Sequence, residues 1–269
     1  MSGILARPLS GQDLYERATA QLDPPFAVVD LAAFDANARD LVRRADGLPI
    51  RVASKSLRCR YLIERVLARP GYRGVMCYSL AEALWLHAAG TSDNLLVAYP
   101  TVDRAGLRAL AADDAARQHI TITIDSAAHL DFIDATLGDG HPELRVCLEL
   151  DVSWRPLTRG PVLQIGTWRS PLRTPEQAAL FAETILKRPG FVLTGVMGYE
   201  GQVAGLGDAP PGHPVRGAVL RFIQSRSLPE LRERRSETVR RIRALTTLEF
   251  VNGGGTGSLE ATSTDTSVT

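Results

Sequence analysis

The stretch Ile50-Arg51-Val52-Ala53-Ser54-Lys55-Ser56 decides how the rest of the chain is interpreted. It follows the turn-forming residues Gly47 and Pro49 and is short, alternating and mostly apolar, which predicts a β-strand that ends near residue 54. Lys55 then stands at the carboxyl end of the strand, where α/β folds place their chemistry. An amine at such a place can form a Schiff base, although a single lysine is more often a solvated surface charge.

Beyond Lys55, short apolar runs alternate with helical patterns of about ten residues, as is typical of a parallel sheet with helices between its strands. We expect a closed barrel rather than an open sheet, because the strands are short and mostly apolar. Seven strands are predicted, at residues 50–54, 74–78, 94–98, 120–124, 145–150, 192–197 and 248–251. The helices are predicted at residues 60–68, 80–89, 104–112, 127–136 and 175–187, followed by a basic helical region that runs to about residue 245.

The two ends of the chain carry separate predictions. Residues 1–46 are expected to form an N-terminal part, with a helix at 11–21, a strand at 26–30 and a helix at 31–44. Residues 47–269 are expected to form the barrel. The polar tail 261–269 stands where an eighth strand is due. We therefore expect a TIM-type (β/α)8 barrel that is truncated before strand eight.

Composition and charge narrow the class of protein. The chain of 269 residues has 45% hydrophobic and 23% charged residues, which is ordinary for a soluble globular protein. Its net charge of +1 gives no reason to expect nucleic acid, and without a long apolar run we expect no membrane span. Cys59, Cys77 and Cys147 lie far apart, and this odd, sparse set fits a reducing cytoplasm better than disulfides or a zinc cluster.

A glycine run after the last predicted strand is the second informative stretch. Gly253, Gly254 and Gly255 leave no side chain between the backbone and a ligand, and Thr256 and Ser258 add hydroxyl groups. Exposed backbone N–H groups in such a loop suit an anion, and barrels often bind phosphate after strands seven and eight. The run has neither the GxxxxGK[ST] nor the GxGxxG spacing, so ATP and dinucleotides are disfavoured. The alternative is a merely flexible loop.

A lysine after the first strand and a phosphate site after the seventh would face the same barrel mouth, which suits pyridoxal 5′-phosphate. With these two motifs the chain resembles the fold type III pyridoxal-phosphate enzymes, whose barrel is the alanine racemase N-terminal domain. Within them it is most similar to the D-threonine aldolase and D-serine dehydratase branch, the amino acid deaminase/aldolase group. The resemblance spans nearly the whole chain and is carried by residues 25–30, 52–56, 194–201 and 252–258.

The resemblance implies roles for individual residues. Lys55 would form the Schiff base with the cofactor. Arg169, in a stretch that resembles the family's Gly-x-x-Arg segment, would donate to the cofactor's phenolate oxygen, and Tyr199 would line the pocket. Tyr78 and Asp151, which also end strands, could line it too. The phosphate would be held by Gly254, Gly255, Thr256, Gly257 and Ser258.

The resemblance also implies an activity, a metal and an assembly. The activity would be that of a lyase on small D-3-hydroxy amino acids, either an aldolase or a deaminase. A divalent metal would be held by a C-terminal β domain beyond residue 269, against which residues 1–46 would pack. We therefore expect this chain alone to be weak or inactive, and the full-length protein to be a homodimer.

Two alternatives stay open at this point. One is an amino acid racemase, or a barrel that binds pyridoxal phosphate without hydroxyl chemistry. The other is a cofactor-free barrel that binds a sugar phosphate and uses Lys55 as an aldolase amine. The proline-rich connection at residues 208–214 is long enough for a lid or a dimer contact. Arginines and glutamates alternate over residues 216–243, which indicates a solvated, salt-bridged helix rather than a nucleic-acid surface.

Overall fold

The structure is a computed structural model that describes residues 11–157, 163–204 and 214–269. The loop at 208–214, for which a lid or dimer contact is predicted, therefore lies almost wholly outside the described residues. The chain forms two units, Met1–Arg39 and Asp40–Thr269. The second unit contains the whole sheet and every predicted site residue.

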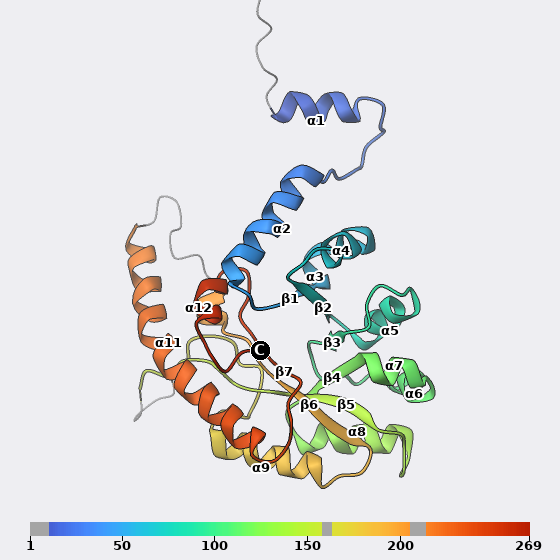
Figure 1. Ribbon diagram of the computed structural model, residues 1–269, viewed down its shortest axis with the longest axis vertical. Helices are drawn as coiled ribbons and strands as arrows, with labels where there is room; N and C mark the ends of the chain where they lie inside the picture. The colour runs from blue at the N-terminus through green and yellow to red at the C-terminus, as the bar shows by residue number, and fades with distance from the viewer. Residues whose placement is uncertain (1–10, 158–162, 205–213) are drawn as a thin grey trace, which may run out of the picture. The chain divides into compact units, whose positions relative to one another are not determined.

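Seven parallel strands form a curled half-barrel in which each strand pairs with the next in sequence (Figure 1). This confirms the seven predicted strands and the barrel type, with boundaries that differ by a few residues. The first and last strands are the outer ones. The strands are β1 Ile50–Ala53, β2 Tyr72–Cys77, β3 Leu95–Val97, β4 Ile120–Ile124, β5 Leu144–Glu149, β6 Phe191–Gly198 and β7 Phe250–Gly253.

Helices cover the outer side of the curled sheet (Figure 1). The predicted helices are present, and four short ones were not predicted: α3, α7, α10 and α12. The helices of this unit after β1 are α3 Ser54–Leu57, α4 Arg60–Leu67, α5 Leu80–Ala88, α6 Arg104–Ala112, α7 Asp114–His119, α8 Ala127–Leu137, α9 Pro175–Leu186, α10 Gly201–Ala204, α11 Pro214–Arg243 and α12 Leu259–Ser263.

Side chains that cap the helices explain where several of them begin. The Ser79 hydroxyl accepts from the Glu82 N–H at the start of α5, and the Asp103 carboxylate accepts from the Gly106 N–H at the start of α6. Thr174 and Gln177 form a reciprocal capping box across the first turn of α9, which begins at Pro175. Each such cap stabilises its helix by roughly 1 kcal/mol, so the sequence itself fixes where the helices leave the barrel mouth.

Apolar side chains fill both sides of the sheet. On one side Leu96, Cys147 and Met197 form a buried cluster, against which Met76 and Phe250 pack. Helices α5, α6 and α8 contribute fully buried side chains, among them Leu86, Leu110 and Leu130. Burying each leucine contributes roughly 1.5–3 kcal/mol, which makes the strands a rigid support for the loops at their carboxyl ends.

The predicted strand at residues 26–30 is wrong. These residues form no strand and lie between α1 Gly11–Thr19 and α2 Leu31–Ala45. Val28 and Val29 are each half exposed, and no strand of the described residues pairs with them. An apolar run becomes a strand only where a neighbour satisfies its backbone groups. Asp30 instead accepts from the Ala32 and Ala33 N–H groups and begins α2.

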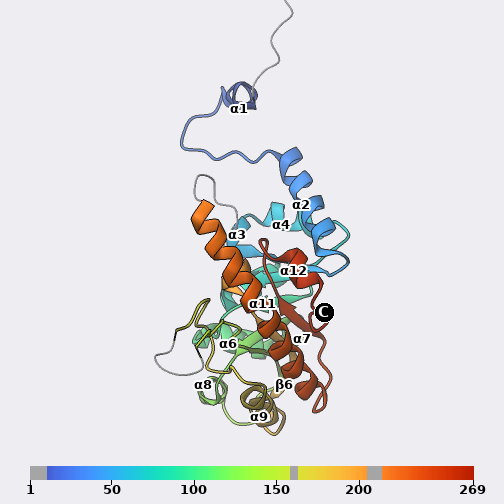
Figure 2. The ribbon, with the colours of Figure 1, turned by 90° about the vertical axis from the view of Figure 1, so that its left-hand side faces the viewer.

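The tail at residues 261–269 returns to the sheet after α12. Helices α11 and α12 lie side by side in Figure 2, and Arg232 of α11 donates to the Ala261 carbonyl at 2.7 Å. At the end of the chain the Thr269 N–H donates to the Val251 carbonyl of β7 at 3.1 Å. The polar tail, which stands in the sequence where an eighth strand is due, therefore packs beside the outer strand β7 without forming a strand itself.

Candidate active site

Lys55 lies in the first turn of α3, directly after β1, rather than at the last position of an extended strand. The predicted strand over 50–54 is thus one residue too long, because Ser54 already begins the helix. The Ser54 side chain is fully buried and donates to the Met76 carbonyl at 3.1 Å and to the Glu82 carboxylate at 2.7 Å. These bonds fix the turn, while the neighbouring Lys55 side chain stays exposed.

Glu82 was not predicted as a site residue, yet it organises this corner of the mouth. Its carboxylate also accepts from the Tyr78 N–H at 2.7 Å, so one side chain of α5 joins the end of β2 to the turn that carries Lys55. Its position three residues after the capping Ser79 is the one signal in the sequence.

Tyr99 is the nearest partner of Lys55 and was also missed as a site residue. The Lys55 Nζ lies 3.3 Å from the Tyr99 hydroxyl, and the Tyr99 ring meets the Tyr78 ring edge-on, with centroids 5.7 Å apart. Tyr99 follows the predicted strand at 94–98 directly, which is the signal that could have found it. Tyr78 therefore belongs to the group around Lys55.

Arg169 also contacts Tyr99. Its guanidinium carbon is 4.6 Å from the Tyr99 ring centroid and 5.7 Å from that of Tyr199. The same guanidinium donates to the Ala98 carbonyl at 2.7 Å. Cation–π contacts and a backbone acceptor thus hold Arg169 between the ends of β3 and β6.

Glu149 is the counterion of Arg169. Its carboxylate Oε1 lies 2.6 Å from the arginine Nε, and its side chain is only 1% exposed at the end of β5. Burial raises the pKa of Glu149 to about 7; the charge of Arg169 opposes this shift, and that of Asp125 adds to it. Sequence reasoning missed Glu149, although a charged residue inside an apolar strand is the pattern that could have indicated it.

Tyr199 continues this series of contacts to the glycine loop. A Cβ atom placed on Gly255 would lie 3.6 Å from the Tyr199 ring and 3.1 Å from the Ala204 side chain. On Gly257 it would lie 2.7 Å from the Ala204 carbonyl oxygen, which is too close. The loop after β7 thus packs closely against α10, at Gly257 too closely for a side chain, and it faces the ring that also contacts Arg169.

The amides of the glycine loop divide into two groups. The Gly254 N–H donates to Glu200 at 2.5 Å, and the Gly255 N–H donates to the Ser258 hydroxyl at 3.1 Å. The Thr256 and Gly257 amides, by contrast, donate to no acceptor within the described part of the chain. These two residues are exposed and directly precede the turn into α12. An anion would therefore meet the amides at 256 and 257 first.

A buried ion-pair network supports the loop from behind. Arg235 of α11 pairs with Glu200 at the end of β6 and, at 2.7 Å, with Asp265 after α12. All three side chains are almost completely buried. Because Glu200 also accepts the Gly254 N–H, this network links α11, β6 and the chain's tail to the conformation of the glycine loop.

Asp151 belongs to a different cluster. Its buried carboxylate accepts from the Ser153 N–H at 2.9 Å and pairs with Arg155 at 3.2 Å and Arg173 at 3.6 Å. None of these contacts reaches Lys55, Tyr99 or Arg169. Asp151 therefore anchors the loop after β5, and the structure does not bring it together with the other predicted residues.

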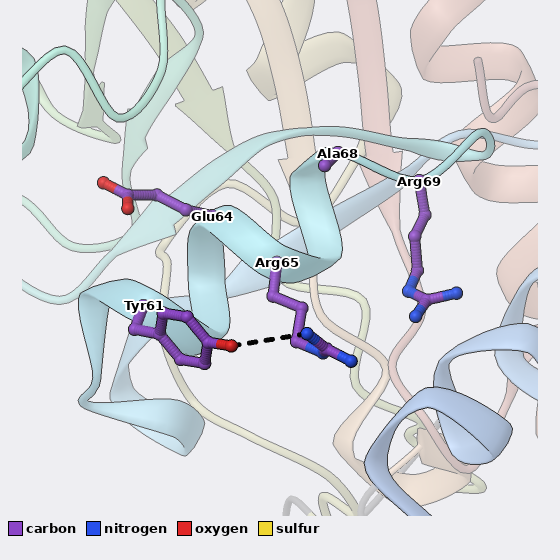
Figure 3. A pocket seen from close by; sticks show the side chains of 5 residues that line it. All are labelled: Tyr61, Glu64, Arg65, Ala68 and Arg69. Carbon is purple, nitrogen blue, oxygen red and sulfur yellow. Dashed lines mark hydrogen bonds between the residues drawn. The ribbon is translucent and has the colours of Figure 1, made fainter. Parts of the chain in front are cut away.

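One further feature lies outside the mouth. Figure 3 shows a surface hollow on α4 that is lined by Tyr61, Glu64, Arg65, Ala68 and Arg69 and that contains no predicted site residue. Within the described ranges, no group of three or more His, Cys, Asp or Glu side chains is arranged to hold a metal ion. No described helix has both the length and the apolar character needed to cross a bilayer.

The family of the chain follows from a comparison with known proteins. The model of the family described as "Alanine racemase, N-terminal domain" matches residues 29–235. The chain belongs to this family. Its members are fold type III pyridoxal-phosphate enzymes, which confirms the resemblance on which the predictions rest.

The chain is also similar to individual proteins. It is 28% identical over 186 residues to a D-threonine aldolase of Arthrobacter sp., covering 68% of this chain and 45% of that protein. Among solved structures it resembles D-threonine aldolase from Filomicrobium marinum, with a TM-score of 0.70, 20% identity, and coverage of 91% of this chain and 60% of that one. It also resembles D-threo-3-hydroxyaspartate dehydratase from Delftia sp. HT23, with a TM-score of 0.64, 23% identity and coverage of 93% and 59%.

The chain spans about half the length of the relatives that it matches. The structural likenesses show the barrel fold, and the activities are those of the relatives.

Proposed function

We propose that this chain is the cofactor-binding barrel of a pyridoxal-phosphate-dependent lyase that acts on D-amino acids with a hydroxyl group on Cβ. The observation that carries the proposal is the continuous series of contacts from the Lys55 amine through Tyr99, Arg169 and Tyr199 to the glycine loop. The sequence similarity to a D-threonine aldolase supports this substrate class.

The residues at the mouth fit pyridoxal phosphate. Lys55 is an exposed amine that contacts Tyr99, and it would hold the cofactor's aldehyde. The Thr256 and Gly257 amides would hold the phosphate, in a loop that Gly254, Gly255 and Ser258 shape. When bound, the cofactor supplies a ring that accepts electron density from the bond that is broken.

The chain's own groups would orient this chemistry. Arg169 would donate to the cofactor's phenolic oxygen, and Glu149 would keep the guanidinium in place through their ion pair. Tyr199 would pack against the cofactor beside the loop. Because the Tyr99 hydroxyl lies within hydrogen-bonding distance of Lys55 Nζ, it could exchange a proton with the amine.

A product assay separates the candidate activities. The protein, mixed with pyridoxal phosphate and a divalent metal, is given D-threonine or D-serine. An aldolase converts D-threonine to glycine and acetaldehyde, whereas a deaminase converts D-serine to pyruvate and ammonia. Formation of either pair supports the lyase. Interconversion of D- and L-alanine with neither product pair would instead favour the racemase, which is the alternative that the family's breadth leaves open.

A further inference from the structure

Arg58, three residues after Lys55, has a backbone conformation that arginine rarely adopts. Its φ of 47° and ψ of 28° lie in the left-handed region at the end of α3, where glycine is the usual residue. Among the described residues other than glycine, only Asp46 shares a positive φ. A bulky side chain is disfavoured in this conformation, and such strain is found mostly at binding sites.

The Arg58 side chain is directed to the group around Lys55. Its guanidinium carbon lies 5.8 Å from the Tyr78 ring centroid. Tyr78 in turn contacts Tyr99, whose hydroxyl lies 3.3 Å from Lys55 Nζ. Two aromatic rings therefore connect the guanidinium to the amine, and both charged groups are exposed at the mouth.

Arg58 has no counterion within the ranges that the structure describes. The arginine two residues later is a useful comparison, because Arg60 also lies over an aromatic ring, that of Trp85, at 5.8 Å. The Arg60 Nε, however, is 3.3 Å from the Glu64 carboxylate. The charge of Arg60 is thus neutralised on the helix surface, whereas that of Arg58 is available to an anion from solution.

The order of the strands indicates which anion this is. Arg58 and Tyr78 follow β1 and β2, whereas the glycine loop proposed for the phosphate follows β7. Arg169, the other arginine near Tyr99, is already paired with Glu149. An amino acid bound at Lys55 brings at least one carboxylate, and the planar fork of an arginine matches a carboxylate through two parallel hydrogen bonds.

We propose that Arg58 binds a carboxylate of the amino acid substrate and so selects amino acids over simple amines. This inference rests on the proposed function, because the substrate must be held at Lys55. The left-handed turn at residue 58 places the guanidinium over Tyr78, next to that position. The carboxylate is either the one on Cα or, in a dicarboxylic substrate, the one on the side chain.

Equilibrium binding to the cofactor-loaded protein tests the proposal without turnover. The ligands are D-alanine, D-aspartate and ethylamine, which lack a β-hydroxyl group and carry one, two and no carboxylates. Affinities are measured by calorimetry for the wild type, Arg58→Gln, Arg58→Gly and the matched control Arg60→Gln. Arg58→Gly relaxes the backbone while it removes the guanidinium, so its melting temperature is expected to stay level or rise.

We expect both Arg58 variants to bind D-alanine and D-aspartate about tenfold or more weakly, with ethylamine affinity unchanged. Arg60→Gln should match the wild type. A loss confined to D-aspartate would assign Arg58 to the side-chain carboxylate. Equal affinities of wild type and Arg58 variants for all three ligands would overturn the role of Arg58 but leave the proposed function standing. If the wild type failed to develop the absorption band of bound pyridoxal phosphate, the proposed function would fail and this inference with it.

Discussion

At the scale of single residues, Glu149 is the group whose ionisation matters most to the barrel mouth. A carboxyl buried at the end of a strand costs free energy when it ionises, and a single arginine offsets only part of this cost. The folded protein therefore holds the Glu149 proton up to a pKa of about 7, well above the 4.5 expected of an exposed glutamate. The ion pair that orients Arg169 is thus complete only above neutral pH.

This raised pKa predicts a pH-dependent stability. Between about pH 4.5 and 7 the folded state binds more protons at Glu149 than the unfolded state does, so the free energy of unfolding falls as pH rises. The proton bound by Glu149 at low pH stabilises the folded state by about 3 kcal/mol relative to pH values above 7, and this difference should be missing from Glu149→Gln. Urea unfolding of both proteins at pH 5 and pH 7.5 measures the difference. Identical pH dependence in the two proteins would show that Glu149 titrates normally.

At the scale of elements, the glycine loop depends on its fit against α10. The Gly257 position has no unusual φ, so a substitution there acts only through the contact of its Cβ with the Ala204 carbonyl, 2.7 Å away. We expect Gly257→Ala to displace the loop and to weaken pyridoxal phosphate binding by about tenfold or more. A cofactor titration checks this, with Gly11→Ala as control because a Cβ at residue 11 meets nothing within 4 Å. Unchanged affinity in Gly257→Ala would remove the loop from the phosphate site.

The network behind the loop joins three elements through one arginine. Replacing Arg235 with methionine leaves Glu200 and Asp265 buried without a counterion, and we expect the free energy of unfolding to fall by about 3–5 kcal/mol. Arg240→Met on the same helix is the control, since the Arg240 side chain is 69% exposed and its ion pair with Glu237 should contribute less than about 1 kcal/mol. Chemical denaturation of the two variants makes the comparison. A similar small loss in both would mean that the network does not hold the tail and the loop together.

At the scale of the whole molecule, the parts of the fold that repeat locally were predictable. Strands such as Ile120–Ile124 and helices such as Arg104–Ala112 are specified by periodicity and caps within a dozen residues. The run at residues 26–30 has the same local pattern but no strand beside it, so the strand predicted there from the pattern alone was wrong. The helix Leu259–Ser263 was missed because it is short and its sequence is polar.

The site was predictable only in part, for the same reason. Lys55 and the glycine loop carry their chemistry in residue types that stand out in the sequence. Tyr99 and Glu149 acquire a role only because the curled sheet brings the ends of β3 and β5 beside Arg169, and sequence spacing does not encode that proximity. Asp151 follows a strand, as a site residue would, but its carboxylate is paired with Arg155 and Arg173. The homodimer, the cytoplasmic location and the metal in a further domain stay predictions.

The composition of the chain makes it easy to test whether Lys55 holds pyridoxal phosphate. Lys55 and Lys187 are the only lysines in the sequence. The Lys187 side chain is 76% exposed, follows α9 and pairs with Glu183 at 3.1 Å, far from the contacts that define the mouth. A lysine that meets the cofactor only by chance should therefore be Lys187, which makes it an internal control.

The most direct measurement is borohydride reduction of the protein mixed with one equivalent of pyridoxal phosphate, followed by digestion and mass spectrometry. We expect a visible absorption band that disappears on reduction, and a label on the peptide that contains Lys55, with little on that of Lys187. Arg169→Gln should keep the same labelled peptide, since Arg169 is proposed to contact the cofactor rather than to hold it covalently. Equal labelling of both lysines, or a label on Lys187 alone in a folded protein, would show that Lys55 is not the residue that holds the cofactor.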